Sequence, residues 1–142
     1  MSRKMKREEW NAFLQCGTRT GKLATVRADG RPHVVPVWFV LDGDDVVFTT
    51  GAGSAKAGAM RRDPRVCMCV DDDNPPFAFV MVEGVATLSD DLDEMLPYAK
   101  VIGGRYMGAD RAEEFGRRNA VSGELLVRVT PTRVLAEAEI AD

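Results

Sequence analysis

The stretch FTTGAGSAKAGAMRRDPR, residues 48–65, combines the end of a strand, a tight turn and the start of a helix. The apolar run Val46–Thr50 predicts the strand, Gly51–Ser54 the turn, and the residues that follow a helix. Ser54 suits the N-cap position because its hydroxyl accepts a hydrogen bond from an early backbone N–H. The free N–H groups and the helix dipole favour an anion at this end, and Lys56 adds a positive charge. We therefore predict a phosphate pocket here, with a solvated basic helix as the alternative.

Short apolar runs separated by turn residues predict a β-rich chain on both sides of this stretch. The expected strands are 22–28, 32–41, 46–50, 65–70, 77–88 and 124–139. A helix is expected over 6–16, and a helical region over 91–119 that is interrupted near Gly103-Gly104 and Gly108. Pro36 cannot donate a ladder hydrogen bond, so it marks an edge strand or a bulge. We expect one domain over residues 1–142, with an α+β fold built on a closed or nearly closed antiparallel barrel.

The strands within 22–41 carry few charged residues on either face. A strand that is apolar on both faces needs a cover on both sides. In a chain of 142 residues, a second subunit is one source of that cover. This pattern predicts a homodimer.

Composition and charge argue against several classes of protein. The net charge of −3 disfavours broad nucleic-acid binding, and no apolar run approaches the roughly 20 residues of a membrane-spanning helix. The basic stretch MSRKMKREEW has no apolar segment behind it, so a secretory signal is not expected. Three cysteines, an odd number, then indicate reduced thiols and a cytoplasmic protein.

The sequence predicts no metal site. His33 is the only histidine, and no Cys-x-x-Cys or His-x-x-x-His spacing occurs. Cys67 and Cys69 lie two apart in a predicted strand, so both point to one face, where we expect them to pack in the core. The acidic run 71–73 lacks the spacing of a calcium-binding loop and is typical of a solvated turn.

No set of catalytic side chains is visible, and no residue is assigned a catalytic role. One histidine does not permit a Ser-His-Asp arrangement, and His33 is only a weak candidate for a proton donor. A phosphate site without acid–base or nucleophilic groups indicates that a cofactor carries the chemistry. The apolar segment Pro36–Trp38 is a candidate wall for a flat ring system, with core filling as the alternative role of Trp38.

The order of the motifs resembles the pyridoxamine 5′-phosphate oxidase-like split β-barrel superfamily. The motifs are GKLATVRADGRPHVVPVWFVLDGDDVVFTT (21–50), SAKAGAMRRDPRV (54–66) and VMVEGVATL (80–88). Together with IGGRYMGADRAEEFGRRNAVSGELLVRVTPTRV (102–134), they are most similar to the coenzyme F420-dependent oxidoreductases of actinobacteria. The resemblance implies a six-stranded antiparallel split barrel of Greek-key type with flanking helices. It also implies a homodimer with two cofactor sites at the subunit interface.

The same resemblance implies roles for individual residues. The phosphate would be held by Thr49, Thr50, Ser54, Ala55 and Lys56, assisted by Arg61. The ring would be lined by Pro36, Val37 and Trp38, and approached from the other subunit by Phe77, Ala78, Phe79 and Val80. Relatives often carry a polar pair where this chain has Gly58-Ala59, which removes possible polar contacts. The F420 tail is polyanionic, and Arg31, Arg61, Arg62 and Arg105 are candidates to contact it.

The resemblance leaves cofactor and activity open. F420 is the expected cofactor and FMN its rival, since members of the superfamily use either. The expected activity is hydride transfer between the cofactor and a small conjugated substrate such as a quinone, a tetrapyrrole or an unsaturated lactone. The alternatives are an FMN-binding oxidoreductase and a non-catalytic flavin- or haem-binding module.

Overall fold

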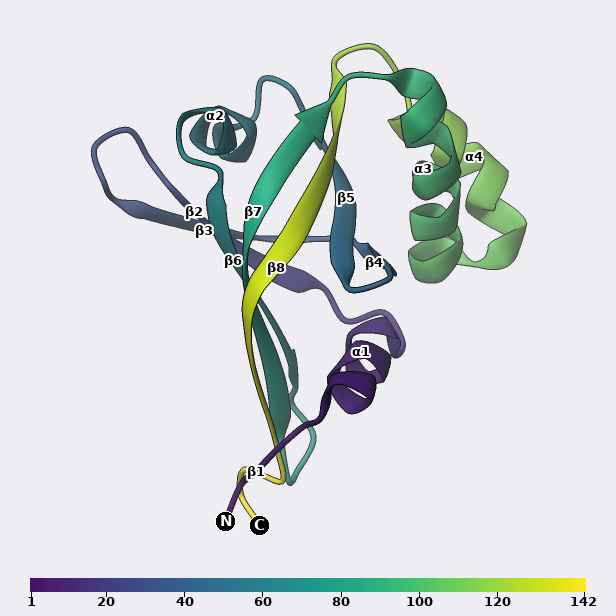
Figure 1. Cartoon of the computed structure of the whole chain (residues 1–142). Coiled ribbons are helices and arrows are strands. Elements are labelled where there is room, and N and C mark those ends of the chain that lie inside the picture. Colours follow the sequence, from purple (N-terminus) through teal and green to yellow (C-terminus); the bar gives the residue numbers. More distant parts are fainter.

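Eight strands form one antiparallel sheet in the computed structural model, which describes residues 1–142 (Figure 1). The strands are β1 (Arg3–Lys4), β2 (Gly21–Val26), β3 (Pro32–Val37), β4 (Val40–Asp42), β5 (Asp45–Gly51), β6 (Arg65–Asp72), β7 (Ala78–Ser89) and β8 (Glu124–Ala138). The helices are α1 (Arg7–Gln15), α2 (Ala55–Arg62), α3 (Leu92–Met107), the 3-10 turn η1 (Ala109–Arg111) and α4 (Ala112–Asn119). None of these helices is long and apolar enough to cross a membrane. The expected mainly β, α+β fold is confirmed.

The sheet is open along one side. Its strands follow the order β3-β2-β6-β7-β8-β5-β4, and the end strands β3 and β4 are not paired with each other. The barrel is therefore split rather than closed. Pro36 lies in β3, an edge strand, as expected for a residue without an N–H donor.

The strand expected over residues 32–41 is two strands, because the chain leaves one edge of the sheet and joins the other. Trp38 and Phe39 lie in the break between β3 and β4. Phe39 is fully buried, so its side chain enters the core as the chain changes partner. This break, together with the two-residue β1, raises the strand count from the expected six to eight.

The main core cluster fills the concave side of the sheet, and a smaller cluster lies on the other face of β5, between β5 and α3. Val46 and Phe48 of β5 belong to the main cluster, which α1 and α2 cover with Leu14 and Met60. Val47, between them, joins the second cluster, against α3. Side chains alternate along a strand, so β5 is buried on both faces. This double burial holds β5, and the turn after it, in a fixed place between α2 and the α3–α4 pair (Figure 1).

The helical region 91–119 is not interrupted at Gly103-Gly104, where a break was expected. Helix α3 runs through both glycines and ends at Gly108, which has a φ of 105°. At Gly103 a Cβ atom would lie 2.5 Å from the Cβ of Phe115, so only glycine lets α3 and α4 approach this closely. The glycine therefore marks a helix–helix contact, not a helix end.

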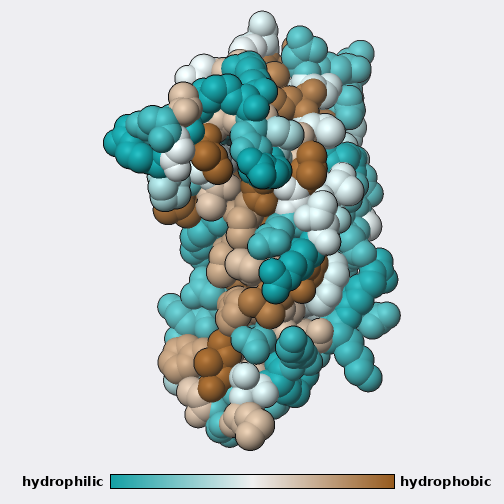
Figure 2. Space-filling view, turned by 60° about the vertical axis from the view of Figure 1, so that its left-hand side comes forward, coloured by the Kyte–Doolittle hydropathy of each residue, from teal (hydrophilic) through white to brown (hydrophobic).

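The prediction that Cys67 and Cys69 pack in the core is wrong. Val66, Met68 and Val70 of β6 point into the core, so the two alternate cysteines lie half-buried on the convex side. There burial raises the pKa of both thiols. The cysteines belong to an apolar set on the convex side, which we call the outer face: Ala24, Val26, Val34, Pro36, Cys67, Cys69, Phe79, Met81 and Leu135. Figure 2 shows apolar side chains running as a band along one side of the molecule.

Candidate functional site

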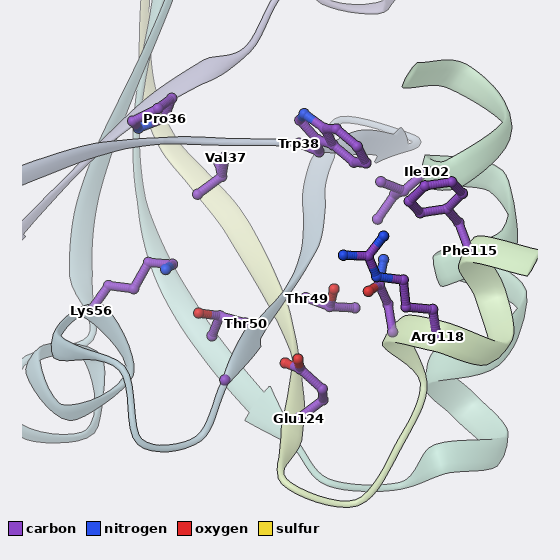
Figure 3. Close-up of a pocket in the computed structure, with 12 residues that line it drawn as sticks. Pro36, Val37, Trp38, Thr49, Thr50, Lys56, Ile102, Phe115, Arg118 and Glu124 are labelled. Carbon is purple, nitrogen blue, oxygen red and sulfur yellow. The ribbon is translucent and has the colours of Figure 1, made fainter. Parts of the chain in front are cut away.

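A cavity of about 430 Å³ lies between the two ends of the split barrel, bounded by β3, β5, α2 and the α3–α4 pair. Its lining is Pro36, Val37, Trp38, Thr49, Thr50, Gly51, Lys56, Ile102, Phe115, Arg118, Asn119 and Glu124. Figure 3 shows Lys56 on one side of it and Ile102, Phe115 and Arg118 on the other, with Thr49, Thr50 and Glu124 between them. The cavity thus has a polar end at α2 and an aromatic end at α4.

The polar end is built by the turn from β5 into α2. Ser54 is the N-cap of α2: its Oγ accepts a hydrogen bond from the Ala57 N–H at 3.2 Å. The same Oγ lies 3.1 Å from Oγ1 of Thr50. Arg61 reaches back and donates to the carbonyl oxygen of Ala52 at 2.8 Å. The turn is therefore fixed by its own side chains, and it places Lys56, in the first turn of α2, in the lining of the cavity.

Two charged groups of opposite sign face the polar end. Lys56, half-buried in the first turn of α2, takes part in neither of the lysine ion pairs of the structure, Lys22–Asp71 and Lys100–Glu113. Glu124 opens β8, and its Oε2 is buried without a hydrogen-bond partner. Burial raises the pKa of Glu124, and the nearby charge of Lys56 opposes that rise only in part. This end holds one unpaired cation and one carboxyl whose pKa is raised by burial.

The aromatic end is ordered by stacking. The Trp38 ring is parallel to that of Tyr106, with centroids 5.1 Å apart and 3° between planes, and it lies 6.0 Å from the ring of Phe115. Tyr106 is itself fixed, since its hydroxyl donates to the Arg19 carbonyl at 2.8 Å. Trp38 keeps 36% of its surface exposed, so it forms a wall of the cavity and is not simply core filling.

The structure brings together six of the thirteen predicted site residues around this one cavity: Pro36, Val37, Trp38, Thr49, Thr50 and Lys56. Ser54, Ala55 and Arg61 lie next to it and shape the turn. The remaining four lie at the start of β7, far from the cavity and close to the chain termini (Figure 1); they are Phe77, Ala78, Phe79 and Val80. Val80 is fully buried in the core of its own chain, which leaves only its backbone for a ligand.

Arg105, a candidate contact for the F420 tail, and His33, a candidate proton donor, both lie away from the cavity. Arg105 donates to the carbonyl oxygens of Leu14 at 2.7 Å, Phe39 at 2.7 Å and Gly17 at 2.9 Å, so its guanidinium is not available to an anionic tail. His33 lies in β3 opposite Thr25 and does not line the cavity. His33 is therefore not positioned to give a proton to a ligand bound there.

Sequence reasoning missed the residues that the far part of the chain contributes. Glu124 reaches the cavity because its strand partner is Gly51 at the end of β5. Ile102 reaches it from α3, which packs against β5, and Phe115 and Arg118 reach it because α4 folds back on α3. The glycine pattern of this helical region was the available signal, since closely packed helices need small residues at their contact.

The residues present fit a phosphate-bearing cofactor with a flat ring. A cation without a partner, a threonine hydroxyl and a capped helix N-terminus supply donors for a phosphate at one end. An exposed indole and a phenyl ring at the other end suit a planar ring system. No group of three or more His, Cys, Asp or Glu side chains is placed to hold a metal ion.

Comparison with known proteins agrees with the expected superfamily. A family model described as pyridoxamine 5′-phosphate oxidase matches residues 7–137. The chain is similar to the conserved hypothetical protein Rv2991 from Mycobacterium tuberculosis, at 27% identity and a TM-score of 0.84, over 95% of this chain and 86% of that one. It is similar to an F420 reductase at 29% identity and a TM-score of 0.67, over 86% and 93%. The FAD binding protein from Mycobacterium smegmatis shares the fold at 24% identity and a TM-score of 0.65, over 94% and 97%.

Proposed function

Since the chain belongs to the pyridoxamine 5′-phosphate oxidase family of flavin-binding oxidoreductases, we propose that it is an oxidoreductase that uses coenzyme F420. It would reduce a small conjugated organic substrate. The similarity to an F420 reductase, at 29% identity, supports this choice of cofactor. FMN is the rival cofactor, since the phosphate end of the cavity suits either.

The two-ended cavity is the observation that carries the proposal. Lys56, Thr50 and the N-terminus of α2 would hold the cofactor phosphate. Trp38 and Val37 would lie along the ring. A ring and a phosphate held at separate ends fix the position of the ring relative to a substrate, and such positioning is a large source of rate.

The protein's own role would be binding, orientation and exclusion of water. When bound, the reduced cofactor supplies a hydride to an electrophilic carbon of the substrate. Phe115 and Ile102, both nearly fully buried, would keep the far end of the cavity apolar and dry. Arg118 lies over the Phe115 ring at 5.3 Å, and its head group would add a positive charge between that end and Glu124 (Figure 3).

We also propose that two copies associate through the outer face. Val34 on β3 is 63% exposed and Val26 on β2 is 39% exposed, and with the neighbouring apolar side chains of the outer face they form one exposed patch of the kind found at protein interfaces. An apolar hollow of about 620 Å³ lies on the same side, lined in part by Ala24, Cys67 and Val85. Burial of this surface in a homodimer would bring Phe77–Val80 of one copy toward the cavity of the other.

Titration of the purified protein with F420 and with FMN, followed by absorbance and fluorescence, tests the proposal. We expect micromolar or tighter binding of F420, weaker binding of FMN, and oxidation of reduced F420 when a quinone such as menadione is added. With reduced F420 deuterated at its hydride carbon and an unsaturated lactone as the substrate, the label should appear on a carbon of the product, because a deuterium on a quinone oxygen would exchange with water. Binding of neither cofactor would refute the proposed function, and tighter binding of FMN would refute the choice of F420.

A further inference from the structure

The half-buried side chain of Glu124 is the feature of the cavity that phosphate binding alone does not explain. Its Oε2 is buried and has no hydrogen-bond partner, although it borders a polar cavity. A buried ionised carboxylate without a donor is costly, and the neutral acid costs much less. The placement of a carboxyl group with an unpaired oxygen at this cavity therefore calls for a functional explanation.

The backbone fixes Glu124 next to the proposed phosphate end. Gly51 is its strand partner, and the Ala52 N–H donates to the Gly123 carbonyl at 2.8 Å. The start of β8 is therefore tied to the turn that carries α2 and Lys56. Figure 3 shows the side chains of Lys56, Thr50 and Glu124 around one space.

The charges around Glu124 decide what it can bind. Lys56 faces it from α2 and Arg118 from α4, while β5 contributes only the neutral Thr49 and Thr50. Neither cation forms an ion pair with Glu124, and its pKa is raised because burial outweighs the charge of Lys56. An ionised Glu124 would repel a phosphate, whereas a neutral carboxyl offers an O–H donor to a phosphate oxygen.

We infer that Glu124 is a second phosphate ligand and that it is the neutral acid in the complex. Where the free side chain is ionised, binding of a phosphate-bearing ligand therefore takes up a proton at Glu124. The inference rests on the proposed function, since it requires the phosphate to lie at Lys56. Bringing an anion next to Glu124 favours its protonated form further. Affinity should therefore be full where free Glu124 is protonated and fall as the pH rises through its titration, by up to about tenfold per pH unit.

The test is isothermal titration of F420 and of FMN into three proteins between pH 5 and 9: wild type, Glu124→Gln and Lys56→Ala. The glutamine is an uncharged mimic of the protonated acid. At the low-pH end, where wild-type Glu124 is protonated, it should bind as wild type does, and at high pH it should bind at least tenfold more tightly than wild type. Titrations in buffers of different ionisation enthalpy should show fewer protons taken up by Glu124→Gln, by up to one. Glu114→Gln, on the surface of α4 and paired with Arg111, is the matched control and should follow wild type.

The outcomes separate this inference from the proposed function. If wild type binds neither cofactor, or if Lys56→Ala binds as wild type does, the phosphate site itself is refuted. If binding is normal but Glu124→Gln follows the wild-type pH profile or is weaker at every pH, the role of Glu124 is refuted. Infrared difference spectra of wild type on binding at pH 8 do not depend on any variant folding. They should show a new protonated carboxyl band, and its absence would refute the inference.

Discussion

Two cationic side chains near the cavity are held in opposite ways. Arg105 is half-buried and donates three hydrogen bonds to backbone carbonyl oxygens, and its guanidinium lies over the rings of Phe39 at 4.7 Å and Tyr106 at 5.0 Å. Lys56 is also half-buried, but it faces a cavity and belongs to no ion pair of the structure. Native structures satisfy almost all their buried polar groups. The contrast teaches that Arg105 belongs to the scaffold, whereas Lys56 and Glu124 have no partner of their own and are the groups that we propose for the ligand.

The largest effect is expected at Arg105. Arg105→Ala leaves three carbonyl oxygens without a donor and should lower the free energy of unfolding by about 3 kcal/mol. Arg105→Lys should lose less, because a single ammonium group keeps the charge but cannot reach all three oxygens. Urea denaturation of both variants measures the difference. If Arg105→Ala were as stable as wild type, the distinction between Arg105 as a stabilising side chain and Lys56 as a ligand-binding side chain would be contradicted.

A smaller loss is expected where α3 and α4 touch. The Cβ of Gly103→Ala would lie 2.5 Å from the Cβ of Phe115, so α4 must shift, at a cost of about 2 kcal/mol. Gly58→Ala is the matched control: inside α2, its nearest neighbour is an Arg62 nitrogen at 4.0 Å, and it should gain about 0.5–1 kcal/mol. Thermal unfolding should separate the two substitutions in sign. A stabilising Gly103→Ala would contradict the close contact.

Trp38 should matter more for binding than for folding. Trp38→Ala removes an exposed wall of the cavity and should weaken cofactor binding by about 1 kcal/mol, while Trp38→Phe should retain most of the affinity. Fluorescence titration with F420 gives both values. If Trp38→Ala lowered the free energy of unfolding but left the affinity for F420 unchanged, Trp38 would instead belong to the scaffold, together with Tyr106.

The smallest effect is expected at His33. Because it does not line the cavity, His33→Ala should change the rate of F420 oxidation by less than about twofold, or 0.4 kcal/mol in activation free energy. Steady-state kinetics with a fixed quinone concentration is sufficient. A tenfold loss of rate would return His33 to consideration as the proton donor.

Local patterns in the sequence were enough to predict one end of the cavity. Ser54 and Lys56 are close in the chain to the strand they follow, so helix capping and strand periodicity place them without knowledge of the fold. The same applies to Pro36, whose missing N–H restricts it to an edge.

The other end depends on contacts that no local pattern specifies. Glu124 lies in the cavity only because β8 pairs with β5, and Phe115 only because Gly103 lets α4 approach α3. The break at Trp38 likewise follows from the separation of the two sheet edges rather than from any turn residue. Phe77–Val80 lie away from the cavity of their own chain, and only the proposed association of two copies would bring them to a cavity, which no local pattern of the sequence specifies.

The most direct test of the central claim is the dissociation constant for F420 of Lys56→Ala beside that of Arg62→Ala. Both substitutions remove one positive charge from α2, but Arg62 is exposed and lies outside the cavity. We predict that Lys56→Ala weakens binding by about 1–3 kcal/mol, or roughly 5- to 150-fold, and that Arg62→Ala changes it by less than about twofold. Both variants should keep the wild-type free energy of unfolding to within about 0.5 kcal/mol. Equal affinities for the two variants would contradict the assignment of this cavity as the cofactor site.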